Sequence, residues 1–282
     1  MLPEDDYRTR IGKCYSCLGK KKKAIADLIR SAPLKVVGMT IGDLAAYCQC
    51  HQTTIVHFAR ELGYKGYPDL KLAIARKSDA LWKQVETQNV SRLSQYENLC
   101  LNLTQMLHKA VENTLQRIPE AKITEAVQYL KKASRIMICG SGTSALAAED
   151  LSFKLTRLGF PVCFSRDAEV WKSLFGLLKK NDVLVIYSHS GETSPYKEIL
   201  KKASEHSIVT LGVTSRLDSS VGNFSTLVLQ TDPGMELPIR LGAMASRSGQ
   251  LALGDLITIK LSQQDKQHSW ETLEALYESY LP

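Results

Sequence analysis

The 282-residue sequence lacks any long hydrophobic run, and no stretch of about 18 consecutive apolar residues occurs, so a membrane-spanning helix is not expected. Its first residues, Met-Leu-Pro-Glu-Asp-Asp, contain neither a basic nor an apolar segment, which argues against a secretion signal. Cysteine is scarce and odd in number, at seven residues. This usage disfavours a disulfide-stabilised fold and favours a reducing compartment. We therefore expect a globular, cytoplasmic protein.

Charged residues are distributed unevenly along the chain. The formal net charge is +7. Residues 1–85 contain 15 Lys and Arg against 8 Asp and Glu, whereas residues 86–282 contain 21 of each sign. The whole excess lies in the first third, which indicates a segment that binds a polyanion, joined to a neutral segment with another task. A solvated basic helix face is the simpler explanation of the same count.

The basic third reads as a series of helices. The spacing predicts helices from about Lys20 to Pro33, from Thr40 as N-cap, from Gln52 to Leu62, and from Pro68 onward. Their apolar faces are formed by Ala24, Ile25, Leu28, Ile29, Ile41, Leu44, Ala45, Cys48, Ile55, Phe58, Leu62, Leu70 and Ile74. Two helices joined by a turn at 49–51, after an opening helix, predict an all-α helix-turn-helix domain at residues 1–78.

The rest of the chain predicts a different architecture. Residues 79–118 read as a helical linker, with a break near Ile118–Pro119. Beyond it, short apolar runs at 135–139, 160–164, 182–187, 208–213 and 226–229 alternate with helical segments. This alternation predicts an α/β domain at 119–282, with a five-stranded parallel sheet flanked by helices. Ligands of such sheets bind beyond the carboxyl ends of the strands.

Two loops that follow predicted strands are rich in hydroxyl groups. Gly140-Ser-Gly-Thr-Ser144 follows the first strand, and Ser188-His-Ser-Gly-Glu-Thr193 follows the third. Both open a helix, where backbone N–H groups and the helix dipole attract an anion. Hydroxyls at helix starts are more often plain caps, but two such loops in one sheet favour a cradle for one phosphate.

The first loop also admits a dinucleotide-binding interpretation. Gly140, Gly142 and Ala145 fit Gly-x-Gly-x-x-Ala, and Ser165-Arg166 at the end of the second strand suits a ribose phosphate. No acidic residue is clearly placed for a ribose hydroxyl, however, and the serine-rich third loop is left unexplained.

Motifs in both halves occur in a fixed order. Those of the first half are Ile25-Ala-Asp27, Ile41-Gly-Asp-Leu-Ala45, Thr54-Ile-Val56, Phe58-Ala-Arg-Glu-Leu-Gly-Tyr-Lys-Gly-Tyr67 and Leu70-Lys71. Those of the second half are Gly142-Thr-Ser144, Asp150-Leu-Ser-Phe-Lys-Leu155, Leu158-Gly159, Ser188-x-Ser-Gly-Glu-Thr193, Ser246-Arg247, Gln250-Leu251 and Asp255. Over about residues 20–260 the chain resembles the RpiR-type bacterial transcriptional regulators, in which a helix-turn-helix domain precedes a SIS (sugar isomerase) domain.

This resemblance implies a homodimeric or homotetrameric regulator that binds a double-stranded DNA operator and senses a phosphorylated sugar. It is expected to be a repressor of a sugar or amino-sugar catabolic operon, without cofactors. Carried over by motif, Ser144, Ser188, Ser190 and Thr193 hold the phosphate, and Glu236 and Arg240 face the sugar or a neighbouring subunit. The predicted effector site also includes Gly142, Thr143, His189 and Gly191. The pattern from Glu236 to Arg247 resembles that of members for amino-sugar phosphates such as N-acetylmuramic acid 6-phosphate.

The DNA-binding residues expected from the helix-turn-helix are Lys21, Lys22, His51, Gln52, Thr53, Thr54, His57, Lys65 and Lys71. Three positions depart from the family pattern. Gln49 replaces a turn glycine, His51 replaces a serine, and His57 replaces an arginine of the recognition helix. Loss of that arginine removes a charged contact to phosphate or guanine, so the departures predict altered specificity or weaker binding.

Two further interpretations concern chemistry. Cys14, Cys17, Cys48, Cys50 and His51 have the residue types of a zinc or redox site, although Cys-x-Cys is an unusual half-site and buried or idle thiols are the favoured interpretation. We expect no metal, and Cys48 belongs to a helix core.

SIS domains also serve in sugar-phosphate isomerases, where Glu192 or Glu236 would be the base. A basic helical module is useful to a DNA-binding regulator and has no evident use in an isomerase. We therefore expect that the protein is not an enzyme.

Overall fold

The computed structural model describes residues 6–76, 94–233, 243–264 and 266–278. By packing, the chain divides into two compact units, and the second begins at Thr104. That division lies inside one long helix, whereas the sequence placed the α/β boundary at residue 119. Glu236 and Arg240 lie outside the described residues. None of the described helices combines the length and the apolar character needed to cross a membrane.

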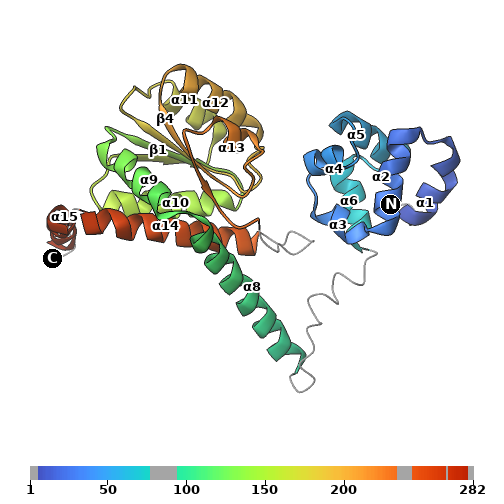
Figure 1. The fold of residues 1–282 in the computed structure, drawn as a ribbon, viewed down its shortest axis with the longest axis horizontal. Helices are drawn as coiled ribbons and strands as arrows, with labels where there is room; N and C mark the ends of the chain where they lie inside the picture. Colours follow the sequence, from blue (N-terminus) through green and yellow to red (C-terminus); the bar gives the residue numbers. More distant parts are fainter. Residues whose placement is uncertain (1–5, 77–93, 234–242, 265, 279–282) are drawn as a thin grey trace. The chain divides into compact units, whose positions relative to one another are not determined.

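The first unit is all-helical (Figure 1). Its helices are α1 (Tyr7–Cys14), α2 (Lys20–Ser31), α3 (Pro33–Gly38), α4 (Ile41–Tyr47), α5 (Gln52–Glu61) and α6 (Tyr67–Arg76), with a 3-10 turn at Tyr15–Cys17. They enclose one core, to which α1 contributes Tyr7 and Ile11. The predicted all-α helix-turn-helix domain is confirmed, and α1 is a further helix within it that the spacing did not predict.

Details of the first unit correct the sequence-based expectation. Pro33 does not merely end a helix: α2 ends at Ser31 and Pro33 is the first residue of α3, where its missing N–H costs nothing. Ala24 is exposed and Ala26 is fully buried, because the buried stripe of α2 is centred on Ile25 and Ile29. Thr40 caps α4 as predicted, and Asp43 completes a reciprocal capping box.

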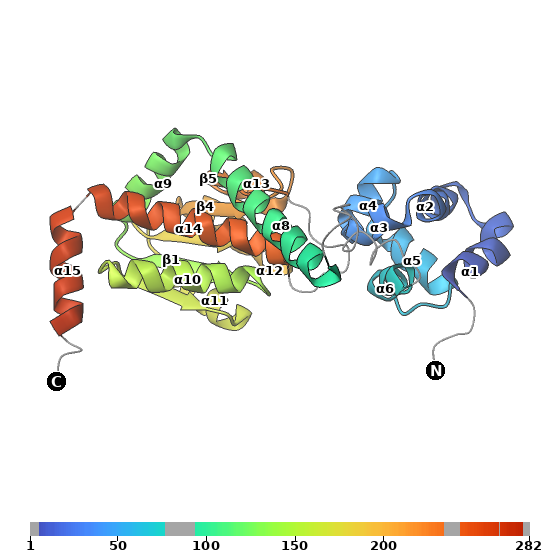
Figure 2. The same ribbon diagram turned by 90° about the horizontal axis from the view of Figure 1, so that it is seen from below.

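The second unit is a three-layer α/β fold (Figure 2). Its strands are β1 (Ile136–Gly140), β2 (Val162–Ser165), β3 (Val183–Tyr187), β4 (Val209–Thr214) and β5 (Leu227–Gln230). All pairs are parallel, in the order β2-β1-β3-β4-β5. The five-stranded parallel sheet predicted from the alternating pattern is confirmed, with each strand within about two residues of its predicted position.

Helices cover both faces of this sheet. One face packs against α9 (Glu120–Lys132), α10 (Ser144–Arg157) and α14 (Met244–Gln264), and the other against α11 (Ala168–Phe175), α12 (Ser194–Glu205) and α13 (Ser220–Phe224). Two more helices, α8 (Gln95–Arg117) and α15 (Lys266–Glu278), complete the described chain. Leu146 of α10 is exposed although the helical spacing placed it inward, whereas Leu151, Leu155 and Leu158 are buried as predicted.

Candidate functional site

The order of the strands determines where a ligand can sit. The chain adds β2 on one side of β1 and then crosses to add β3 on the other side. A crevice opens at such a reversal, outside the carboxyl ends of the two strands. Gly140 and Tyr187, the last residues of β1 and β3, are paired in register. The two hydroxyl-rich loops therefore leave the sheet side by side. The sequence predicted that both follow carboxyl ends of strands in one sheet, and the strand order makes them neighbours.

The first loop connects β1 to α10. A Cβ atom on Gly140 would lie 2.9 Å from the Cα atom of Ala145, so glycine lets the helix start close to the strand. Gly142 adopts a left-handed φ of +58°. Ser144 is the first residue of α10 and is buried, and Thr143 precedes it without a side-chain capping bond. The loop thus places the start of α10, and with it the positive end of the helix dipole, directly after β1.

The second loop follows β3 and folds around its first hydroxyl. Ser188 Oγ accepts a hydrogen bond from the Gly191 N–H (3.1 Å) and lies 3.2 Å from Thr193 Oγ1. Ser190 Oγ accepts a weaker bond from the Glu192 N–H at 3.4 Å. Gly191 has a φ of +67°. The structure therefore brings Ser188, Ser190 and Thr193 into one compact turn at the start of α12.

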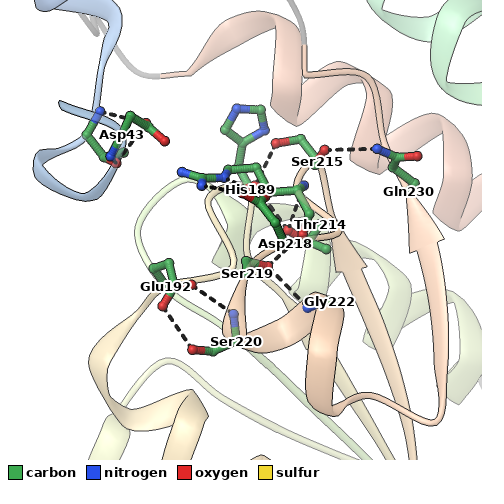
Figure 3. A network of polar contacts seen from close by, with 12 residues as sticks. Asp43, His189, Glu192, Thr214, Ser215, Asp218, Ser219, Ser220, Gly222 and Gln230 are labelled. Carbon is green, nitrogen blue, oxygen red and sulfur yellow. Dashed lines mark hydrogen bonds and ion pairs between the residues drawn. The ribbon is translucent and has the colours of Figure 1, made fainter. Parts of the chain in front are cut away.

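A third loop, after β4, supports the second (Figure 3). The His189 carbonyl accepts hydrogen bonds from the Ser215 hydroxyl (2.8 Å), the Ser215 N–H (3.1 Å) and the Thr214 hydroxyl (3.2 Å). A Cβ atom on Gly191 would lie only 1.9 Å from Ser219 Oγ, so no side chain fits there. Sequence reasoning missed this supporting loop, for which the hydroxyl-rich stretch 214–220 was the available signal.

Glu192 has a structural task in this network. Its carboxylate accepts hydrogen bonds from the Ser220 N–H at 2.8 Å and from the Ser220 hydroxyl at 2.9 Å (Figure 3). It thereby caps the start of α13, where a negative charge is favourable. Of the two carboxylates considered as an isomerase base, Glu192 is thus engaged with the protein itself, and Glu236 lies outside the described residues.

The helix-turn-helix is formed by α4, a turn and α5. Gln49, in the turn, has a φ of +48°, the conformation for which the family uses glycine. Of the predicted DNA-binding residues, those with exposed side chains are Lys21, His51, Gln52, Thr53, His57 and Lys65, while Thr54 is half-buried. Arg60 is exposed one turn after His57 and was missed, although the spacing of three residues pointed to the same face.

Two of the predicted DNA-binding lysines have partners within the unit. Lys22 forms an ion pair with Glu61, and Lys71 donates a hydrogen bond of 2.8 Å to the Met39 carbonyl. Both side chains are only half-exposed. Contact with DNA by either lysine competes with these internal bonds, so Lys21 and Lys65 are the better placed of the four lysines.

The cysteines do not assemble a metal site in the part of the chain that the structure covers. There, no three His, Cys, Asp or Glu side chains lie close enough to hold a metal ion. Cys48 is buried in the helical core as predicted, and burial raises the pKa of its thiol.

Comparison with known proteins identifies both units. Residues 6–80 match the helix-turn-helix domain of the rpiR family, and residues 129–260 match the SIS domain. An uncharacterized HTH-type transcriptional regulator of Haemophilus influenzae is 29% identical over 276 residues, covering 96% of this chain and 95% of the relative. A similarly described regulator of Thermotoga maritima is 28% identical, covering 92% and 93%.

A solved structure, the Vibrio vulnificus NanR protein complexed with ManNAc-6P, has a similar fold. It superposes with a TM-score of 0.74 over 97% of both chains, at 23% identity. The order of the two domains, the five-stranded parallel sheet and the full-length relatives agree with one another. The chain therefore belongs to the RpiR-type family of HTH-type transcriptional regulators, with a helix-turn-helix domain followed by a SIS domain.

Proposed function

We propose that this regulator is a repressor of a sugar or amino-sugar catabolic operon and that a phosphosugar bound at the ends of β1 and β3 relieves repression. The observation that carries the proposal is the juxtaposition of two hydroxyl-rich helix starts at the crevice of the sheet. Ser144, Ser188, Ser190 and Thr193 are the proposed phosphate ligands, with Gly142, Thr143, His189 and Gly191 shaping the loops. The ManNAc-6P held by the similar NanR protein supports an amino-sugar phosphate.

The regulator is proposed to act without catalysis. An isomerase needs a base that can reach the proton next to the substrate carbonyl. Glu192, the carboxylate within the loop 188–193, accepts two hydrogen bonds from Ser220. Its engagement favours a binding site over an active site. The related full-length chains, which bear the names of transcriptional regulators, support the same choice.

We further propose that the active form contains two copies, or two pairs of copies, of the chain. A dimer sets two recognition helices, α5 and its symmetry mate, in successive major grooves, so the operator is near-palindromic. An effector that changes operator occupancy 5–150-fold needs a coupling of only about 1–3 kcal/mol.

The proposal is tested by a thermal-shift screen of hexose and hexosamine 6-phosphates that includes N-acetylmannosamine 6-phosphate. We expect at least one compound to raise the melting temperature and to weaken binding to operator DNA, with no turnover of that compound. The double variant S188A/S190A should lose the response and keep its DNA affinity. S173A/S204A removes two exposed hydroxyls elsewhere on the same unit and is the matched control.

Two outcomes count against this division of tasks. Loss of operator binding by a well-folded S188A/S190A variant would show that the loops serve the DNA-binding unit. Steady turnover of a stabilising sugar phosphate by the wild-type protein would make the chain an isomerase instead.

A further inference from the structure

Helices α10 and α14 run side by side and begin at the same edge of the sheet (Figures 1 and 2). Lys154 of α10 forms ion pairs with Asp150 and with Asp255 of α14. A Cβ atom on Gly254 would lie 3.8 Å from Leu151 Cβ. Gly254 of α14 therefore stands opposite Leu151 of α10.

This register places Arg247 near the phosphate loops. Leu151 is seven residues after Ser144, and Gly254 is seven residues after Arg247. Seven residues are about two helical turns, so Arg247 lies close to the level of Ser144. Positions 247, 250 and 254 are separated by three and four residues and share one face of α14. Because Gly254 faces α10 and the Tyr187 hydroxyl (3.7 Å), Arg247 and Gln250 face the same way.

The donors along this face lack partners. The Gln250 side chain is only 1% exposed, and its amide nitrogen has no hydrogen-bond partner among the described residues. The hydroxyl of Tyr187, the residue before Ser188, is fully buried and also without a described partner. The Tyr187 hydroxyl lies at the level of Gly254, about two helical turns from Arg247. Because buried donors are normally satisfied, it is the unsatisfied Gln250 amide, one turn from Arg247, that points to an absent acceptor at the proposed site.

Arg247 differs from the other arginines of the second unit. Within the described residues the others have a carboxylate or an aromatic ring as a partner: Arg117 with Asp232, Arg135 with Asp182, Arg157 with Phe153, Arg166 with Glu149, and Arg216 with Asp218. For the Arg247 guanidinium no such partner occurs among them, although this side chain is half-buried. A half-buried guanidinium without a counter-charge suits an anionic ligand.

We infer that Arg247 is an effector-binding residue whose guanidinium bonds the phosphate held by Ser144 and Ser188. Gln250, one turn further along α14, lies at the buried end of the same site. The inference rests on the proposed function and adds the cation that the hydroxyl loops lack. A planar guanidinium offers two parallel N–H donors in a fixed fork that matches two phosphate oxygens, whereas an ammonium acts as a point charge.

The test compares R247M with R247K and with K260M. Lys260 lies on the same helix but pairs with Glu120 at its far end, so K260M is the matched control. The probes are N-acetylmannosamine 6-phosphate, inorganic phosphate, and N-acetylmannosamine without phosphate, titrated by calorimetry and thermal shift. We expect R247M to weaken both phosphate compounds at least 10-fold, R247K to weaken them less, and K260M to change neither.

A pH series separates ligation from a structural role. The second ionisation of a phosphate has a pKa of about 6, so wild-type affinity should rise between pH 5.5 and 7.5. In R247M this rise should flatten, because the second negative charge has lost its partner. Operator binding without effector should stay within about 2-fold of wild type.

Any other outcome contradicts either the role of Arg247 or the proposed phosphate site. Wild-type affinity retained within 2-fold by a folded R247M refutes the role of Arg247 and leaves the proposed function standing. If R247M does not fold, R247K decides by the same criterion. Failure of the wild-type protein to bind either phosphate compound overturns this inference and the proposed phosphate site together.

Discussion

In the proposed function, the two units of this regulator bind the same chemical group, a phosphate, by different means. The helical unit lies in the part of the chain that holds the whole charge excess, and its exposed lysines, histidine and arginine suit a polyanion. The α/β unit lies in residues 86–282, which are neutral overall, and it offers hydroxyls, backbone N–H groups and two helix starts. Many cations give strong and salt-sensitive attraction, whereas neutral donors give short-range, shape-dependent binding. Binding by mainly neutral donors suits a sensor, because a sensor must release its ligand.

The largest expected difference between the units is in salt dependence. Raising the salt from 50 to 200 mM should weaken operator binding by about 1,000-fold, because each phosphate contact releases a counterion. Affinity for N-acetylmannosamine 6-phosphate should fall by less than about 5-fold, since one guanidinium and several neutral donors face it. Fluorescence anisotropy and calorimetry measure the two. Equal losses of affinity for DNA and for the sugar phosphate would contradict the proposed difference between the two units.

Within the α/β unit, two glycines with similar φ separate strain from steric fit. G191A should lower the free energy of unfolding by about 2–3 kcal/mol and abolish the effector response, because its Cβ meets Ser219 Oγ. G142A meets no atom within 4 Å and should cost about 1 kcal/mol from its φ alone. Urea denaturation compares them. Similar costs for both would show that the Ser219 contact is not rigid.

In the helical unit, restoring the family's arginine should strengthen DNA binding. H57R should raise operator affinity by about 10-fold and steepen the salt slope by about one contact, because His57 is exposed on α5. S31R adds the same charge at an exposed site on α2 and is the control. An equal gain from both variants would mean that net charge, and not position, governs binding.

The smallest expected effect concerns the backbone of the turn. Q49G should stabilise the helical unit by about 0.5–1 kcal/mol, because glycine adopts the φ of +48° without strain. Ser207, with a φ of +54°, offers the same substitution in the α/β unit. Thermal unfolding of Q49G and S207G measures both. A loss of stability in Q49G would indicate that the glutamine side chain makes a compensating contact.

Much of the fold was predictable because its signals are local. Alternation of apolar strands with helical segments predicted all five strands, and Val183–Tyr187 lies within the predicted 182–187. The two hydroxyl loops were recognisable from composition and position. The same local signals failed at Leu146 and Ala24, since helical spacing marks a stripe but not how far the neighbouring elements extend over it.

The sequence by itself determined the basic first third, the helix-turn-helix, the strands and the residues of the two hydroxyl-rich loops, because each depends on residues close in the chain. Only the tertiary structure decided which loops are neighbours: pairing of β1 with β3, and of β3 with β4, places Ser215 against His189 and Ser219 against Gly191. It also decided that Lys22, Lys71 and Glu192 have partners within their own units. Local spacing specifies the face on which a side chain lies, while the element opposite that face depends on long-range packing.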